Sequence, residues 1–204
     1  MDYRGSDNLG AEFQRAVIGD AGDGPGKDVM AGVAALVARG FIDESRIGVS
    51  GWSYGGYMTS WLIGHYPETW KAALAGAAVT DYVESYALSD MNYAIAIDGQ
   101  PIYASVPHTT AGRSVPWTPK GQAAWAEQSP ISSVWRVKTP TLILSNTRDQ
   151  RVPVVESYKL FRALRDLGVE AEFVAYHLDG HGHSDPYHER DVERRWLDWF
   201  TRKL

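Results

Sequence analysis

Apolar residues recur along this chain with two spacings, those of amphipathic helices and of short buried strands. The predicted strands are 46–50, 71–79, 141–144 and 171–176, and the predicted helices are 29–40, 54–66, 154–167 and 188–204. Gly40 and Gly168 stand where two of these helices should end, because glycine readily adopts the left-handed backbone of a helix C-cap. Since strands alternate with helices, the pattern predicts an α/β fold with a mainly parallel sheet flanked by helices.

Two stretches lack such a period. Residues 20–26 are rich in glycine, aspartate and proline, which predicts a loop. Residues 80–138 contain several aromatic residues and the prolines Pro101, Pro107, Pro116, Pro119 and Pro130. We interpret this longer stretch as loops and short helices packed over one edge of the sheet, an insertion that forms a lid or a substrate pocket.

Composition limits both the architecture and the function. With 204 residues, of which 44% are hydrophobic, the chain can bury one sizeable core, so we expect a single domain over residues 1–204. The formal charge is -5 and no block of like charges occurs, which argues against nucleic acid or an anionic membrane as a partner. No apolar run approaches a membrane span of about 18 residues and no signal-peptide core is present, so a cytoplasmic protein is expected. Cysteine is absent, and a covalent mechanism would need another nucleophile.

The strongest candidate for chemistry is the run Gly-Trp-Ser-Tyr-Gly at 51–55, directly after a predicted strand. In a nucleophile elbow, a serine stands on a tight turn between a strand and a helix, and the residues two before and two after it have almost no side chain. Gly51 and Gly55 meet this demand, and Gly56 gives the turn further room. The pattern therefore predicts that Ser53 projects over the sheet as a nucleophile.

A serine hydroxyl needs a histidine to accept its proton and an acid to orient that histidine. In parallel sheets such partners lie in loops beyond the carboxyl ends of the strands. Asp149 follows the strand predicted at 141–144, and His181 follows the one predicted at 171–176. The order serine, aspartate, histidine is that of α/β-hydrolases. We therefore expect Ser53 to attack, His181 to transfer the proton and Asp149 to orient the imidazole.

Other interpretations of these residues stay open. Aspartate is also common in turns and at helix N-caps, so Asp149 could have such a structural role instead. His183 is a second candidate for the base, and His177 lies where a strand is predicted to end. His181 and His183 are close enough in sequence to suggest a metal site, although the loop lacks the helical spacing of a zinc motif and the chain has no cysteine. We expect no metal and no cofactor.

Five motifs are spread over nearly the whole chain. They are Tyr-Arg-Gly-Ser at 3–6, Gly-Trp-Ser-Tyr-Gly-Gly-Tyr-Met at 51–58, Thr-Pro-Thr-Leu-Ile-Leu at 139–144, Asp-Gln-Arg-Val-Pro at 149–153 and Gly-His-Gly at 180–182. Together they resemble the catalytic domain of prolyl oligopeptidase-type serine peptidases, which include dipeptidyl and acylaminoacyl peptidases. The resemblance implies that Ser53 is the nucleophile, Asp149 the orienting acid and His181 the base.

The resemblance also implies roles for residues around the nucleophile. The backbone N–H of Tyr54 would be one donor of the oxyanion hole, and Tyr54, Tyr82 and Val152 would line the pocket for the residue on the acyl side of the scissile bond. Members of the family usually carry a β-propeller ahead of the catalytic domain, followed by early sheet strands and a loop with a second oxyanion donor. None of these parts is found in this chain, so we expect a partial α/β-hydrolase fold.

These departures have two expected consequences. Losing one oxyanion donor lowers turnover about 100- to 1,000-fold in serine hydrolases, and peptides should suffer more than esters because amides have the poorer leaving group. Without the early strands, the strand before Ser53 stands at the edge of the sheet, and such an edge is a template for another chain. We expect it to be covered by the N-terminal residues or by a second subunit, and a homodimer is the preferred hypothesis.

The sequence therefore predicts a serine hydrolase that acts through an acyl-enzyme intermediate on small carboxylic esters, with short peptides as a second substrate class. One alternative is a strict serine peptidase or aminopeptidase, which needs an anchor for a substrate terminus that the sequence does not reveal. Another is an inactive fragment or binding module that keeps the three residues without a complete oxyanion hole.

Overall fold

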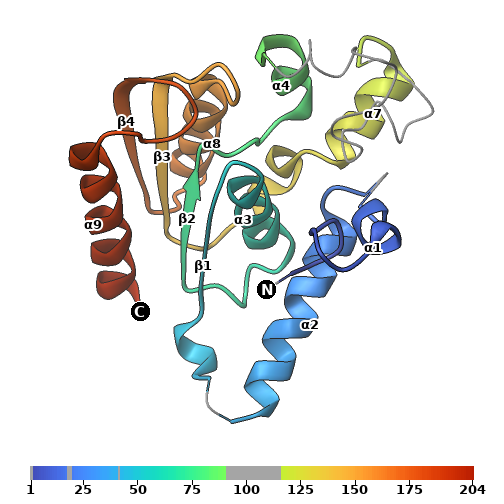
Figure 1. The fold of residues 1–204 in the computed structure, drawn as a ribbon, viewed down its shortest axis with the longest axis vertical. Coiled ribbons are helices and arrows are strands. Elements are labelled where there is room, and N and C mark those ends of the chain that lie inside the picture. The colour runs from blue at the N-terminus through green and yellow to red at the C-terminus, as the bar shows by residue number, and fades with distance from the viewer. Residues whose placement is uncertain (1, 18–19, 41, 91–115) are drawn as a thin grey trace.

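The computed structural model describes residues 2–17, 20–40, 42–90 and 116–204 of the chain. At its centre four parallel strands form one sheet, in which neighbours in sequence are also neighbours in space (Figure 1). The strands are β1 (Gly48–Trp52), β2 (Ala72–Gly76), β3 (Thr141–Arg148) and β4 (Ala171–Asp179). Helices lie between successive strands, as parallel pairing requires, so the predicted α/β fold is confirmed.

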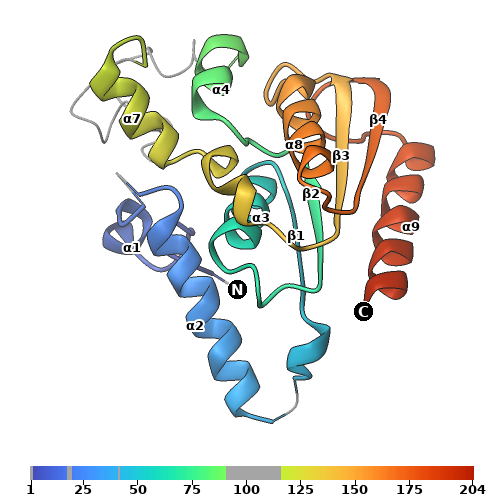
Figure 2. The same ribbon diagram turned by 180° about the vertical axis from the view of Figure 1, so that it is seen from behind.

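Helices cover both faces of the sheet (Figures 1 and 2). The described helices are α1 (Ala11–Arg15), α2 (Asp23–Ala38), α3 (Tyr54–His65), α4 (Tyr82–Leu88), α7 (Pro119–Glu127), α8 (Val154–Asp166) and α9 (Pro186–Lys203), with the 3-10 helices η1 (Glu44–Arg46) and η2 (Pro130–Arg136). Helix α3 packs on β1 and β2, helix α8 packs on β3 and β4, and α9 lies on the opposite face. Within the described part of the chain, no helix is long and apolar enough to span a membrane.

Alternate residues of the central strands fill two separate apolar cores. Ala73 and Ile143 belong to the core beneath α3 and α8, whereas Leu74, Leu142 and Leu144 pack in the core beneath α9. Strand β2 is buried on both faces, which explains why its sequence reads as a continuous run of small apolar residues. Strand β1 is only partly buried, as expected of the outermost strand.

Several helix boundaries agree with the predicted elements, whereas β1 lies two residues later than the strand predicted at 46–50 and β2 ends three residues before the end predicted at 79. Helix α3 begins at the predicted residue, and the helices predicted at 154–167 and 188–204 end within a residue of the prediction. Gly40 and Gly168 both follow helices with a φ of 75°, which confirms the predicted caps. Strands β3 and β4 extend further than predicted because their backbones stay paired after the apolar pattern has ended.

The loop predicted at 20–26 is wrong, because α2 already begins at Asp23. The Asp20 carboxylate accepts the N–H of Gly24 at 2.8 Å, and proline is tolerated in a first helical turn. Glycine is needed in this segment for close packing and not for a loop. A Cβ added to Gly22 would lie 2.4 Å from the Trp61 ring. Local composition does not reveal this contact, since Trp61 is far away in sequence.

The insertion expected at 80–138 lies partly outside the described residues, at 91–115. Its described parts contain the short helices α4, α7 and η2, as expected. The N–H of Tyr82 donates to Ser129 Oγ at 2.9 Å, which ties the start of α4 to the segment before η2. The role of this insertion as a lid or a substrate pocket stays a prediction.

The described N-terminal residues pack on α2 and α3. Arg4 forms an ion pair of 2.6 Å with Asp28 of α2, and the Tyr3 ring lies 6.3 Å from the Tyr54 ring. No described residue pairs with the free edge of β1. Of the two expected covers for this edge, the N-terminal residues therefore do not supply a paired strand.

Candidate active site

Ser53 occupies a strained turn between β1 and α3. Its φ is 61°, a positive value that is rare for residues other than glycine, and its N–H donates to the Gly76 carbonyl of β2 at 2.9 Å. This is the backbone of a nucleophile elbow. The turn holds the serine at the carboxyl end of the sheet, where the sequence pattern placed it.

The requirement for glycine around Ser53 differs from the prediction at one position. A Cβ on Gly51 would lie 2.4 Å from the Gly55 carbonyl, which confirms the need for glycine there. At Gly55 an added Cβ meets nothing within 4 Å, so the expectation for this residue is wrong. Gly56 carries the second constraint, because its Cβ would lie 2.4 Å from the Gly76 carbonyl oxygen. The close approach of α3 to β2 therefore leaves no room for a side chain at residue 56.

This difference gives a matched pair of variants. Gly56→Ala should destabilise the protein by ~2 kcal/mol or more, because the new methyl group meets backbone that cannot move without lifting α3 from the sheet. Gly55→Ala should be neutral or stabilising by up to ~1 kcal/mol, because alanine favours the helix and has open space. Chemical unfolding of both variants measures the difference. Equal stability of the two would contradict the packing argument.

The structure brings together the three side chains predicted for the site. His181 Nε2 lies 2.7 Å from Ser53 Oγ, and His181 Nδ1 lies 2.7 Å from Asp149 Oδ2. The three residues follow β1, β3 and β4 respectively, all at the carboxyl edge of the sheet. The Asp149 side chain is fully buried, whereas 28% of the His181 side chain is exposed. A hydroxyl, an imidazole and a carboxylate thus form one chain of hydrogen bonds from the solvent-facing side to the interior.

Asp149 is fixed by its own loop. Its Oδ1 accepts the N–H groups of Arg151 at 2.8 Å and Val152 at 3.0 Å, which leaves Oδ2 for His181. The interpretation of Asp149 as a turn residue is therefore also correct, because one oxygen closes the turn while the other contacts the imidazole. Both carboxylate oxygens of Asp149 therefore have hydrogen-bond partners.

The other histidines lie elsewhere. His183 is in contact with the rings of Trp52 and Tyr176 at centroid distances of 5.0 and 5.1 Å, and burial lowers the pKa of its imidazole. His177 belongs to β4 and lies 3.2 Å from Thr147 Oγ1. Neither replaces His181 as the neighbour of the serine. Among the described residues, no group of three or more potential ligands could hold a metal ion.

Two of the three residues expected to bind substrate, Tyr54 and Tyr82, belong to one aromatic cluster through Tyr57. Tyr54 is the first residue of α3, where backbone N–H groups have no partner within the helix. Its hydroxyl donates to the Ala21 carbonyl at 2.6 Å, and its ring stacks on Tyr57, which in turn contacts Tyr82. Tyr82 and Val152 are 6% and 2% exposed. Their roles in an acyl-side pocket stay a prediction.

Glu156 is a buried carboxyl group that the sequence pattern did not single out. Its Oε2 accepts the N–H groups of Thr80 and Asp81, the latter at 2.9 Å, and so joins the start of α8 to the loop after β2. Desolvation raises the pKa of Glu156 to about 8, although these backbone donors oppose the shift. A glutamate in an amphipathic helix gives no sequence signal of burial, since most such residues face solvent.

The raised pKa of Glu156 predicts a stability that falls as the pH rises. The folded carboxyl keeps its proton up to about pH 8, whereas in the unfolded chain it loses it near the usual pKa of about 4.3. Relative to Glu156→Gln, which cannot titrate, the wild type should therefore lose up to ~1.4 kcal/mol per pH unit across this interval. Urea unfolding of both proteins between pH 4 and pH 9 measures the difference. A difference that does not change with pH would refute the prediction.

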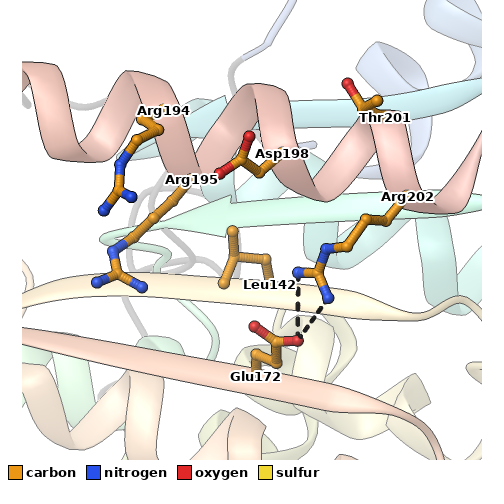
Figure 3. A pocket seen from close by; sticks show the side chains of 7 residues that line it. All are labelled: Leu142, Glu172, Arg194, Arg195, Asp198, Thr201 and Arg202. Atoms are coloured by element: carbon orange, nitrogen blue, oxygen red, sulfur yellow. Dashed lines mark hydrogen bonds and ion pairs between the residues drawn. The ribbon is translucent and has the colours of Figure 1, made fainter.

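A cavity of about 330 Å³ lies between α9 and the sheet (Figure 3). Leu142 and Glu172 line it from the starts of β3 and β4, at the opposite end of the sheet from Ser53. Its arginines are already paired with carboxylates, for example Arg202 with Glu172 at 3.3 Å and Arg195 with Asp191 at 2.6 Å. Its lining has three arginines, two carboxylates, one leucine and one threonine, and it contains no serine, histidine or cysteine.

The fold and the site together define a class of protein. A serine elbow after one parallel strand, followed by an aspartate and a histidine after later strands, is the arrangement of α/β-hydrolases. Comparison with known proteins gives the family, because the prolyl oligopeptidase family matches over residues 1–204. The chain belongs to the prolyl oligopeptidase family, and the resemblance inferred from its motifs is confirmed.

Individual relatives agree with this assignment. The chain is 33% identical to the uncharacterized peptidase YuxL of Bacillus subtilis and 30% identical to the acylamino-acid-releasing enzyme of Arabidopsis thaliana, over 100% and 99% of its length. It covers only 29% and 26% of those proteins. The solved acylaminoacyl peptidase of Pyrococcus horikoshii matches 99% of the chain with a TM-score of 0.84 and 27% identity, and the chain covers 31% of that structure.

Proposed function

We propose that this chain is a serine hydrolase that cleaves acyl compounds through a covalent acyl-enzyme. The observation that carries the proposal is the continuous set of contacts from Ser53 Oγ through His181 to Asp149, each of 2.7 Å, on a serine held with a φ of 61°. These distances are those needed for proton transfer from a nucleophile to a base. Membership of the prolyl oligopeptidase family supports the same chemistry.

In the proposed reaction, Ser53 Oγ attacks the substrate carbonyl carbon while His181 Nε2 takes the hydroxyl proton. The imidazolium that forms is stabilised by Asp149 Oδ2. The oxygen of the tetrahedral intermediate receives a hydrogen bond from the Tyr54 N–H, at the positive end of the α3 dipole. When the intermediate collapses, His181 returns the proton to the leaving alcohol or amine. Water then attacks the acyl-enzyme with the same proton transfers, which regenerates Ser53.

Two substrate classes follow from different observations. The names of the Arabidopsis and Pyrococcus relatives point to peptides whose first amino acid is acylated, and we propose such short peptides as the substrates. The site also supports hydrolysis of small carboxylic esters, because they need the same nucleophile and have the better leaving group. Esters should therefore be cleaved faster than the corresponding amides.

A substrate panel tests this proposal. The protein should hydrolyse p-nitrophenyl esters, and acetyl-aminoacyl nitroanilides should react faster than nitroanilides with a free amino group. The reverse order for the two anilides would favour an aminopeptidase. No hydrolysis of any substrate by folded protein would support the alternative of an inactive binding module.

We also propose that the protein forms a homodimer through β1. This strand pairs with β2 on one side only within the described sheet, and a free edge readily pairs with another chain. Size-exclusion chromatography with light scattering at micromolar concentration should give twice the 22.6 kDa of one chain. A mass of one chain across that concentration range would count against the dimer.

A further inference from the structure

Three consecutive carbonyl groups of the loop that carries His181 accept hydrogen bonds from two side chains of the sheet. Asn146 Nδ2 donates to the carbonyl oxygens of Gly180 at 3.0 Å and Gly182 at 3.1 Å. Trp52 Nε1 donates to the carbonyl oxygen of His181 at 2.8 Å. We infer that Asn146 and Trp52 are positioning residues, which hold this loop so that the imidazole meets the serine. The inference rests on the function proposed above.

The two glycines beside His181 have open space around them. Gly180 has a φ of 81°, and a Cβ added to Gly180 or to Gly182 would meet no atom within 4 Å. Glycine gives the backbone on both sides of His181 more freedom than any other residue would. The side-chain hydrogen bonds to the carbonyl groups of residues 180–182 therefore restrain the part of the loop that these glycines leave free.

Both donors belong to strands of the sheet. Asn146 is 0% exposed and lies in β3, opposite Tyr176 of β4. Trp52 is the last residue of β1, and its ring packs against Gly76, where an added Cβ would be 2.1 Å away. Oδ1 of Asn146 accepts no hydrogen bond from the described residues, so the amide acts here as a donor only. The sheet thus positions both reacting residues. Ser53 directly follows β1, whereas the loop of His181 is tied to the sheet by the side chains of Asn146 and Trp52.

Reaction rates depend steeply on such alignment, and a displacement of about 1 Å can lower a rate about 100-fold. Asn146→Leu has nearly the same shape and lacks both donors, whereas Trp52→Phe keeps a ring and loses its N–H. We expect each substitution to lower kcat for a p-nitrophenyl ester about 10- to 100-fold, with KM within about twofold of the wild type. The rate of inactivation by a fluorophosphonate should fall in parallel, because it uses the same serine and histidine.

The decisive comparison repeats Asn146→Leu in a His181→Ala background. A residue that acts only through His181 should change the residual rate there by less than about twofold. The same loss in both backgrounds would show a general structural role and overturn the inference. A wild-type kcat in a folded Asn146→Leu variant would also overturn the inference. If that variant does not fold, a wild-type kcat in Trp52→Phe would overturn it. Wild-type protein that does not react with the fluorophosphonate would instead refute the proposed function, independently of these variants.

Discussion

Replacing Ser53 by alanine should abolish hydrolysis and covalent labelling while leaving the fold intact. His181 Nε2 lies 2.7 Å from Ser53 Oγ, and no other hydroxyl is recorded within hydrogen-bond distance of that nitrogen among the described residues. Removing the nucleophile of a serine hydrolase lowers kcat on the order of 10⁴- to 10⁶-fold. The remaining rate would come from binding and oxyanion stabilisation alone.

Fluorophosphonate labelling followed by mass spectrometry measures this effect directly. Wild-type protein should gain one adduct on the peptide that contains Ser53, and Ser53→Ala should gain none. Ser50→Ala is the matched control, because Ser50 is an exposed residue of the same strand and should label like the wild type. Labelling of folded Ser53→Ala at the wild-type rate would assign the nucleophile to another residue.

Asp149→Asn should lower kcat on the order of 10³- to 10⁴-fold, because it should force His181 into the wrong tautomer. The N–H groups of Arg151 and Val152 both donate to Oδ1, so an asparagine would keep its carbonyl oxygen there. Its NH₂ group would then face His181 Nδ1 as a donor. The imidazole would have to carry its proton on Nε2, which could no longer accept the proton of Ser53.

The control is Asp179→Asn, which removes a carboxylate at the end of β4, close to the histidine loop. The Asp179 side chain is 80% exposed and its contact with Arg148 is 3.4 Å long, so activity should stay within about twofold of the wild type. If both variants lost activity equally, a general effect of charge would explain the loss. Unfolding midpoints near that of the wild type would show that Asp149→Asn acts on the reaction and not on folding.

The predicted elements were accurate where one local rule decided the structure. The apolar run at 141–144 begins strand β3, and the glycine at 168 ends helix α8 as predicted. The errors arose where a distant residue set the requirement. Gly22 is needed because Trp61 packs against it, and Gly56 because the Gly76 carbonyl lies across from it. No spacing along the chain reveals such contacts.

By itself, the sequence determined that Ser53, Asp149 and His181 each follow a strand, because the apolar pattern that defines each strand is local. Only the tertiary structure decided how these groups are held. The two 2.7 Å contacts, the donation by Asn146 to the histidine loop and the burial of Glu156 all join segments far apart in sequence. Hydrogen-bond geometry and desolvation depend on distances in space, and these exist only after the sheet has formed.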